Sequence, residues 1–252
     1  RRVLFRSVFF DELQIPKPDY NLNVGSTSHG KQTAAMITGI EEILLKEQPV
    51  CCIVYGDTNS TLAAAVAASK IQVPLVHIEA GLRSFNKIMP EEINRITCDH
   101  CSTLLFSPTS SGVENLLHEG FNLNATPPYS INNPKVFHCG DVMYDNSLHF
   151  AGVASNKTAI LNRLDLHQDA YILATIHRNA NTDDASRLNA IFGAFNKVVA
   201  DYKFQLVLPL HPRTKKMLSQ NLSPELLAKT EANQLDRKST RLNSSHVSES
   251  RM

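Results

Sequence analysis

Short apolar runs rich in valine and isoleucine alternate along this chain with segments of helical periodicity. This alternation is typical of βαβ units, in which crossover helices join parallel strands. In the first part of the chain it predicts strands at 50–55, 73–78, 103–106 and 136–139. It predicts helices at 28–46, 59–70, 90–101 and from 109 to the glycine at 120. The sequence therefore predicts an α/β protein with a parallel sheet.

The same pattern restarts after residue 145, which predicts a second α/β domain. We expect helix 146–163, strand 171–175, helix 184–201, strand 205–209 and helix 212–220. We therefore place one Rossmann-like domain at 8–145 and the first part of another at 146–235. The run from Val50 to Tyr55 is apolar throughout, as expected of a strand that is covered on both faces.

The two ends of the chain fit neither domain. Back-translation of residues 1–7 and 236–242 gives DNA strings that are reverse complements apart from their terminal bases. Both strings resemble sequencing-adapter DNA that was read through in frame. The alternative, a natural basic tail at each end, does not explain the complementarity. We interpret 1–7 and 236–252 as an artefact and exclude them from the fold.

Composition narrows the classes of partner. Residues 8–235 hold 18 basic and 22 acidic side chains, so the charge balance gives no support for a nucleic acid partner. No apolar run approaches the roughly 20 residues that cross a bilayer, so we expect no membrane partner. The five cysteines predict reduced thiols and a cytoplasmic location. Cys98 and Cys101 have the spacing of half a metal site, but without a second pair we expect no metal.

Polar side chains follow several of the predicted strands. Asp57, Glu79 and Asp141 follow strands of the first domain, and His177 with Arg178 follows a strand of the second. Ligands of parallel sheets bind beyond the carboxyl ends of the strands, so a cleft between the domains would unite these residues. For each residue an alternative stays open, because a carboxylate after a strand is often a helix cap and a histidine can be structural.

Glu91 and Glu92 stand in the first turn of the helix that we expect to begin at Pro90. Acidic residues there usually stabilise the helix dipole, by about 0.3–1 kcal/mol. One of the two can instead face a cleft, and the sequence leaves both roles open.

Six motifs together resemble the non-hydrolysing UDP-N-acetylglucosamine 2-epimerase family. They are GDTNSTLAAAVAASKIQVPLVHIEAGLRS, MPEEINR, SPT, GDVMYD, TIHRNANTDD and LPLHPRTKK, and the resemblance covers nearly all of residues 21–220. It implies a GT-B-like architecture, in which two Rossmann-type domains enclose the active site. The segments RSF, GDVMYD and LHPRT are similar to the branch that acts on UDP-2,3-diacetamido-glucuronate.

The resemblance also implies a reaction and the residues that perform it. Asp57, Glu79 and Glu91 match the catalytic carboxylates of the family, and His177 matches a histidine of substrate binding and catalysis. The family inverts C2 of a UDP-linked N-acetylated sugar without a cofactor or metal. A base removes the C2 proton as UDP leaves, a proton returns on the other face, and UDP adds back.

The diphosphate of such a substrate needs cations. Arg178 is the first candidate, followed by Arg83 and Arg95, although surface ion pairs explain these arginines equally well. Some members of the family carry a regulatory UDP-sugar site, to which Gln32, Arg178 and His211 are candidates.

The chain departs from the family at both ends. We expect an opening strand with an arginine loop before residue 8, and uridine-binding and diphosphate-binding segments after residue 235. Ala180 also stands where the family commonly has glutamate. We therefore expect that both domains are incomplete, that the 252-residue polypeptide is inactive and poorly stable, and that its full-length parent is a homodimer.

Three other functions stay open beside the 2-epimerase. They are a glycosyltransferase of the same architecture, a hydrolysing 2-epimerase, and a nucleotide-binding module without catalysis. Exchange of the C2 hydrogen with solvent separates the epimerases from the other two. Accumulation of UDP identifies the hydrolysing enzyme.

Overall fold

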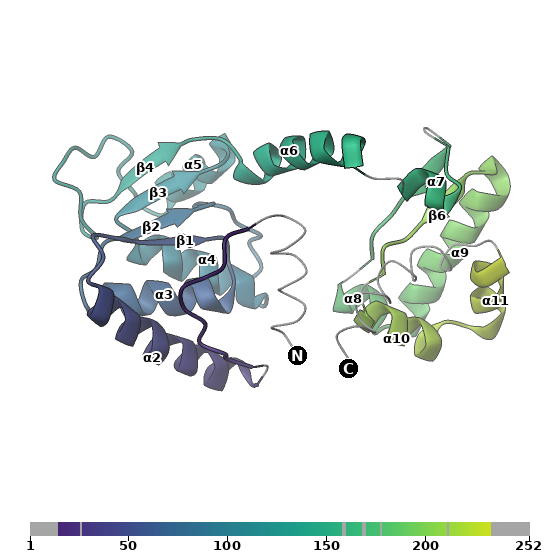
Figure 1. The fold of residues 1–252 in the computed structure, drawn as a ribbon, viewed down its shortest axis with the longest axis horizontal. Helices are drawn as coiled ribbons and strands as arrows, with labels where there is room; N and C mark the ends of the chain where they lie inside the picture. Colours follow the sequence, from purple (N-terminus) through teal and green to yellow (C-terminus); the bar gives the residue numbers. More distant parts are fainter. Residues whose placement is uncertain are drawn as a thin grey trace. The chain divides into compact units, whose positions relative to one another are not determined.

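The structure, a computed structural model, describes residues 15–25, 27–157, 160–167, 170–176, 178–210 and 212–232. The segments interpreted as artefact, 1–7 and 236–252, lie outside these residues. The chain divides into two compact units within helix α6 (Val142–Lys157), at residue 153, whereas the sequence placed the division at 145. Each unit is described separately below (Figure 1).

The first unit, residues 18–153, is built on one sheet of parallel strands, in the order β1 (Cys52–Tyr55), β2 (Leu75–Ile78), β3 (Leu104–Ser107) and β4 (Lys135–His138). Before and between the strands run helices α2 (His29–Glu47), α3 (Asn59–Lys70), α4 (Pro90–Cys101) and α5 (Ser110–His118). The predicted α/β class is therefore confirmed.

Local signals fix where these helices begin. The side chains of Thr58 and Thr109 act as N-caps of α3 and α5, and each accepts a hydrogen bond from the third following backbone N–H. Pro90 occupies the first turn of α4, where its missing N–H costs nothing.

The helices that contact the sheet in this unit all cover the same face. Val54, His77, Leu105 and Val136 lie side by side across the four strands and point toward these helices. Helix α3 packs on β1 and β2, α4 on β2, and α5 on β3 and β4, while α2 forms an outer layer on α3 (Figure 1). Because the strands follow one another in sequence order, each right-handed crossover places its helix on the same side.

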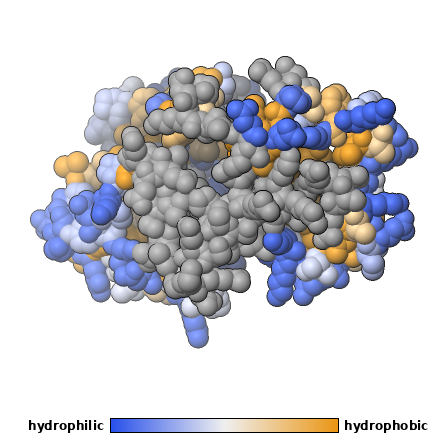
Figure 2. Space-filling model, turned by 45° about the vertical axis from the view of Figure 1, so that its right-hand side comes forward, coloured by the Kyte–Doolittle hydropathy of each residue, from blue (hydrophilic) through white to orange (hydrophobic). Residues whose placement is uncertain are grey.

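The prediction that both faces of the strand at 50–55 are covered is therefore wrong for the described residues. Val54 is only 7% exposed, but Ile53 and Tyr55 on the opposite face are 53% and 59% exposed. In the same row as Tyr55, Phe106 and Phe137 stack with ring centroids 5.0 Å apart. Figure 2 shows apolar residues, in orange, at the surface of the described chain among hydrophilic residues in blue.

The second unit contains a short parallel pair, β5 (Tyr171–Leu173) and β6 (Gln205–Val207). Its helices are α7 (Ile160–Leu164), α8 (Asn179–Thr182), α9 (Ala185–Tyr202), α10 (Pro212–Asn221) and α11 (Pro224–Ala232). Leu188 and Phe192 of α9 form a core with Leu206, Leu208 and Leu210. Helices α8 and α11 are additions to the prediction. No helix in the described part of the chain is long and apolar enough to cross a membrane.

Gly81 lies where the loop after β2 closely approaches helix α5. Its φ is +80°, and a Cβ at this position would lie 2.3 Å from the carbonyl oxygen of Gly112. We expect Gly81→Ala to lower the free energy of unfolding by about 2–4 kcal/mol, because backbone strain and overpacking add. Gly30→Ala, with open space around the new methyl group, should change it by less than about 0.5 kcal/mol. Equal stability of the two variants in urea denaturation would contradict this packing.

Candidate active site

Three carboxylates lie at one edge of the first sheet. Asp57 follows β1, Glu79 follows β2 and Asp141 follows β4, and the carboxyl ends of parallel strands meet at the same edge. A Cβ placed on Gly56 would lie 3.4 Å from Oε2 of Glu79, so the Glu79 carboxylate lies against the turn that carries Asp57. The structure therefore brings Asp57 and Glu79 together within one unit.

The backbone of Glu79 is in an unfavourable conformation. Its φ is +77°, in the left-handed region that non-glycine residues avoid at a cost of about 1–2 kcal/mol. The backbone N–H groups of Glu79 and Ala80 both donate to the carbonyl oxygen of Phe106, at 3.1 and 3.0 Å, and hold this turn in place. Strain of this kind concentrates at functional sites.

The surroundings of Glu79 also favour its neutral form. Burial, followed by the nearby carboxylates of Asp141 and Asp57, raises the pKa of Glu79 above its ordinary value of 4.5, while the charges of His77 and Arg95 act in the opposite direction. An acidic group with a raised pKa beside other carboxylates is a common feature of acid–base sites.

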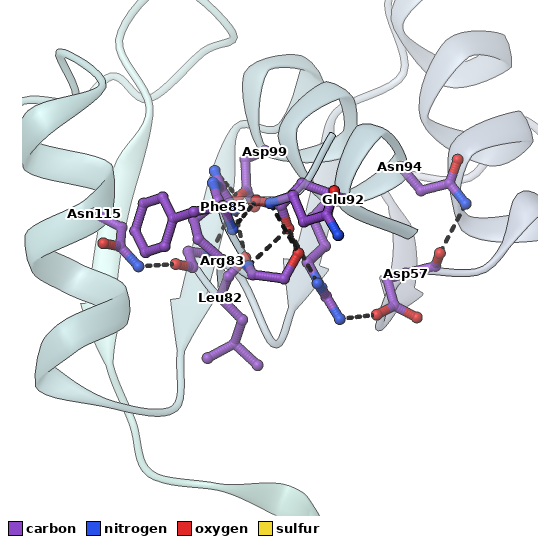
Figure 3. Close-up of polar contacts among 12 residues, drawn as sticks. Asp57, Leu82, Arg83, Phe85, Glu92, Asn94, Asp99 and Asn115 are labelled. Carbon is purple, nitrogen blue, oxygen red and sulfur yellow. Dashed lines mark hydrogen bonds and ion pairs between the residues drawn. The ribbon is translucent and has the colours of Figure 1, made fainter. Parts of the chain in front are cut away.

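Helix α4 holds the turn of Asp57 in place. The Asn94 side chain donates to the carbonyl oxygen of Asp57 at 2.8 Å, and Arg95 forms an ion pair with the Asp57 carboxylate. Arg95 also donates to Oε2 of Glu92 at 3.1 Å (Figure 3). Two neighbouring residues of α4 therefore hold Asp57: Asn94 binds its backbone and Arg95 binds its side chain.

The two glutamates at the start of α4 have different environments. Glu92 is 1% exposed, and its carboxylate accepts hydrogen bonds from the backbone N–H groups of Ser84 and Phe85, both at 2.9 Å. Burial acts to raise the pKa of Glu92, but these hydrogen bonds and Arg95 outweigh it and lower the pKa. Glu91 is exposed, and no described hydrogen bond joins it to Asp57 or Glu79. The structure therefore assigns Glu92 to anchoring the loop and leaves Glu91 accessible.

A cluster of buried charges lies behind these turns. His77 Nδ1 lies 2.6 Å from Oδ1 of Asp99, whose Oδ2 accepts from Gly81 N at 3.1 Å and lies 2.7 Å from the Arg83 guanidinium. Arg83 also binds Glu119 through two hydrogen bonds of 2.7 Å (Arg83 and Asp99 are labelled in Figure 3). The Arg83 side chain is 1% exposed. Its burial and its two carboxylate partners argue against the predicted contact with a diphosphate.

The remaining predicted residues are spread over both units. Asp141 caps α6, since Oδ1 accepts from Met143 N at 2.8 Å. Gln32 donates to the carbonyl oxygen of Gly25 and accepts from Asn59. Arg178 is exposed in the second unit, where its carbonyl oxygen accepts from the backbone N–H groups of Asn181 and Thr182 at the end of α8. His177 and His211 lie outside the described residues.

Metal-binding side chains do not gather in the described residues. No group of three or more histidine, cysteine, aspartate or glutamate side chains suited to a metal occurs there. Cys98 is instead buried in the core beside Val54 and Leu75, and this burial raises the pKa of its thiol.

Comparison with known proteins decides the family. A model of the family described as UDP-N-acetylglucosamine 2-epimerase matches residues 4–240. The chain belongs to this epimerase family.

Relatives of this epimerase-family chain include a UDP-N-acetylglucosamine 2-epimerase homolog of Methanococcus maripaludis, 48% identical over 214 residues. A UDP-2,3-diacetamido-2,3-dideoxy-D-glucuronate 2-epimerase of Pseudomonas aeruginosa is 48% identical over 213 residues. Both alignments cover 84% of this chain and 56% of the relative. The chain therefore spans little more than half the length of these relatives.

A solved structure of the same family also matches. The Methanocaldococcus jannaschii UDP-GlcNAc 2-epimerase, in complex with UDP-GlcNAc and UDP, has a TM-score of 0.75 and 40% identity. The match covers 92% of this chain and 60% of that one. It confirms the predicted fold class, the GT-B-like α/β fold of these epimerases.

Asp99 and His77, which shape the site of this epimerase-family chain, were not identified from the sequence, and the partners of Glu92 and Arg95 were not predicted. Glu92, Arg95 and Asp99 recur at spacings of three and four, which places them on one face of α4. His77 stands inside an apolar strand, where a buried imidazole needs partners. Both signals are visible in the sequence, but they do not identify the partners.

The raised pKa of Glu79 predicts a pH-dependent effect on stability. Its folded-state pKa is above 4.5, so its contribution to stability is present below this pH and is lost as the pH rises through the folded pKa. Glu79→Gln, which mimics the neutral acid, should therefore increase the free energy of unfolding at pH 7–8 and lose this gain at acid pH. Glu114→Gln, at an exposed position of α5, is the matched control. Urea denaturation at several pH values measures the difference, and a Glu79→Gln variant less stable at pH 8 than at pH 4, relative to wild type, would contradict it.

Proposed function

We propose that this chain carries the acid–base carboxylates of an enzyme that inverts C2 of a UDP-linked N-acetylated sugar. The observation that carries the proposal is the pairing of two unlike carboxyl groups at one sheet edge. Glu79 is strained and its pKa is raised by burial and neighbouring carboxylates, whereas Asp57 is neutralised by Arg95. Family membership makes C2 epimerisation the reaction that these groups fit best.

Inversion at C2 needs proton transfer on both faces of the sugar. In our proposal a base removes the C2 proton while the UDP–C1 bond breaks, which forms a glycal and UDP. An acid then returns a proton to C2 from the other face, and UDP adds back to C1. Glu79, whose neutral form is favoured, suits the proton donor, and Asp57 suits the base. We propose Glu91 and His177 as the further catalytic residues.

The diphosphate requires positive charge, and we propose Arg178 and Arg95 as its ligands. Arg178 is exposed and therefore available. Arg95 is bound to Asp57 and Glu92 in the free chain, so a phosphate would compete with Asp57 for its guanidinium. We propose that His177 and Arg178 belong to the same functional site.

The most direct test follows the C2 hydrogen. The chain, extended to the length of its relatives, is incubated with UDP-N-acetylglucosamine in D₂O, and NMR measures deuterium at C2. We expect incorporation with inversion, and a loss of about 10²- to 10⁴-fold in kcat for Asp57→Asn, Glu79→Gln and Glu91→Gln. Glu114→Gln should retain wild-type activity. Turnover without deuterium at C2 would refute the proposal.

Two sugar substrates are compatible with the relatives. The 48% identity to both Methanococcus and Pseudomonas proteins supports UDP-N-acetylglucosamine and UDP-2,3-diacetamido-glucuronate alike. The same assay with both substrates ranks them by kcat/KM. Accumulation of free UDP would assign the hydrolysing reaction instead, and nucleotide binding without exchange would assign a binding module.

We also propose a location, an oligomeric state and an activity for this chain. The five cysteines are free thiols, which supports a cytoplasmic location. The homodimer rests on the resemblance alone. We also propose that the 252-residue polypeptide alone is inactive, because it spans 56–60% of the relatives' length. Normal turnover by this polypeptide would refute that last point.

A further inference from the structure

One buried imidazole joins the two turns that carry Asp57 and Glu79. His77 belongs to β2, two residues before Glu79, and is fully buried. Its Nε2 lies 2.9 Å from the carbonyl oxygen of Gly56, the residue before Asp57, and its Nδ1 lies 2.6 Å from Oδ1 of Asp99. The side chain therefore connects β2 both to the end of β1 and to helix α4.

The two partners of His77 determine where its hydrogens lie. A backbone carbonyl oxygen has no hydrogen to give, so Nε2 must be the donor to Gly56. Oδ2 of Asp99 accepts from Gly81 N at 3.1 Å and lies 2.7 Å from the Arg83 guanidinium, so the Asp99 carboxylate is surrounded by donors. An ionised Asp99 needs a hydrogen on Nδ1 of His77 as well. Hydrogen bonding thus requires both ring nitrogens to be protonated.

We propose that His77 is an imidazolium with a hydrogen on each ring nitrogen, and that it positions the Asp57 and Glu79 turns against each other. This inference rests on the proposed function, in which Asp57 and Glu79 act together. It names His77 as the residue on which the spacing of these two carboxylates depends. His77 is a positioning residue: it holds the backbone of Gly56 and is itself oriented by Asp99, whose other oxygen holds the backbone of Gly81.

Charged groups continue outward from His77 as a chain of ion pairs. Asp99 of α4 contacts His77, Arg83 of the loop after β2 contacts Asp99, and Glu119 at the end of α5 contacts Arg83. Glu119 Oε2 also lies 3.5 Å from Nε2 of His100 of α4. This cluster interacts electrostatically with the nearby Glu79, because the charge of His77 acts to lower the pKa of Glu79. Loss of the imidazolium charge should therefore raise the pKa of Glu79 further.

The charge on His77 can be measured by NMR, without an assay of enzyme activity. In the ¹⁵N-histidine-labelled chain, extended to the length of its relatives, His77→Gln assigns the His77 signals. We expect both nitrogens to show the chemical shift of protonated imidazole nitrogens at pH 7. A non-protonated ring nitrogen on His77 at pH 7 would overturn the proposal and would leave the epimerase function untouched.

The positioning role is tested in the chain extended to the length of its relatives. His77→Asn keeps an amide donor near Asp99, and His77→Gln keeps one near Gly56, but neither carries charge. We expect both to lower kcat by about 10²-fold with little change in KM. We also expect the limb of the pH–rate profile that reports Glu79 to move up by about one pH unit.

The matched control is Ser107→Ala, which removes a buried hydroxyl of β3 that donates to Thr109 and is not bonded to the cluster. It should lower stability without moving the pH profile. If the His77 variants lose stability but keep both kcat and the pH limb, His77 has only a structural role and the proposal fails. If wild type shows no C2 exchange at all, the proposed function fails, and the NMR result still decides the charge of His77.

Discussion

The first unit depends on the polar face that helix α4 presents to the sheet. Glu92 binds the loop at 84–85, Arg95 binds Asp57, and Asp99 binds His77, Gly81 and Arg83. Buried charges are costly unless each is paired and hydrogen-bonded, and the described side chains leave no buried polar atom without a partner. This complete pairing fixes two turns that the backbone alone would leave free.

The same arrangement explains why strain at Glu79 persists. Its left-handed backbone and the carboxylates around it both oppose folding, yet the turn is held by Phe106 on one side and by the Gly81–Asp99 contact on the other. Interactions elsewhere in the unit offset this local cost, as expected where a site needs a particular geometry. The chemistry that we propose depends on these two carboxyl groups at one edge of the sheet: Glu79 has a raised pKa, and Asp57 is paired with Arg95.

Sequence patterns predicted most of the elements because the strands are apolar and the helices are periodic. Helices α3 and α4 begin and end where their patterns do, and Asp57 and Glu79 were found from their positions after strands. Which face each helix covers depends on strand order, so the exposure of Ile53 and Tyr55 was missed. The partners of Arg83 could not be predicted either, because nothing in its local sequence indicates that Asp99 and Glu119 bind it.

We propose that Asp57 and Glu79 are held together in order to act on one carbon atom. The decisive measurement is a crystal structure of the chain extended to the length of its relatives, with a UDP-sugar bound. We expect C2 of the sugar to lie within reach of a carboxyl oxygen of both residues, directly or through one water molecule, at about 2.6–3.2 Å per step. A sugar bound with C2 beyond the reach of both carboxyl groups would contradict it.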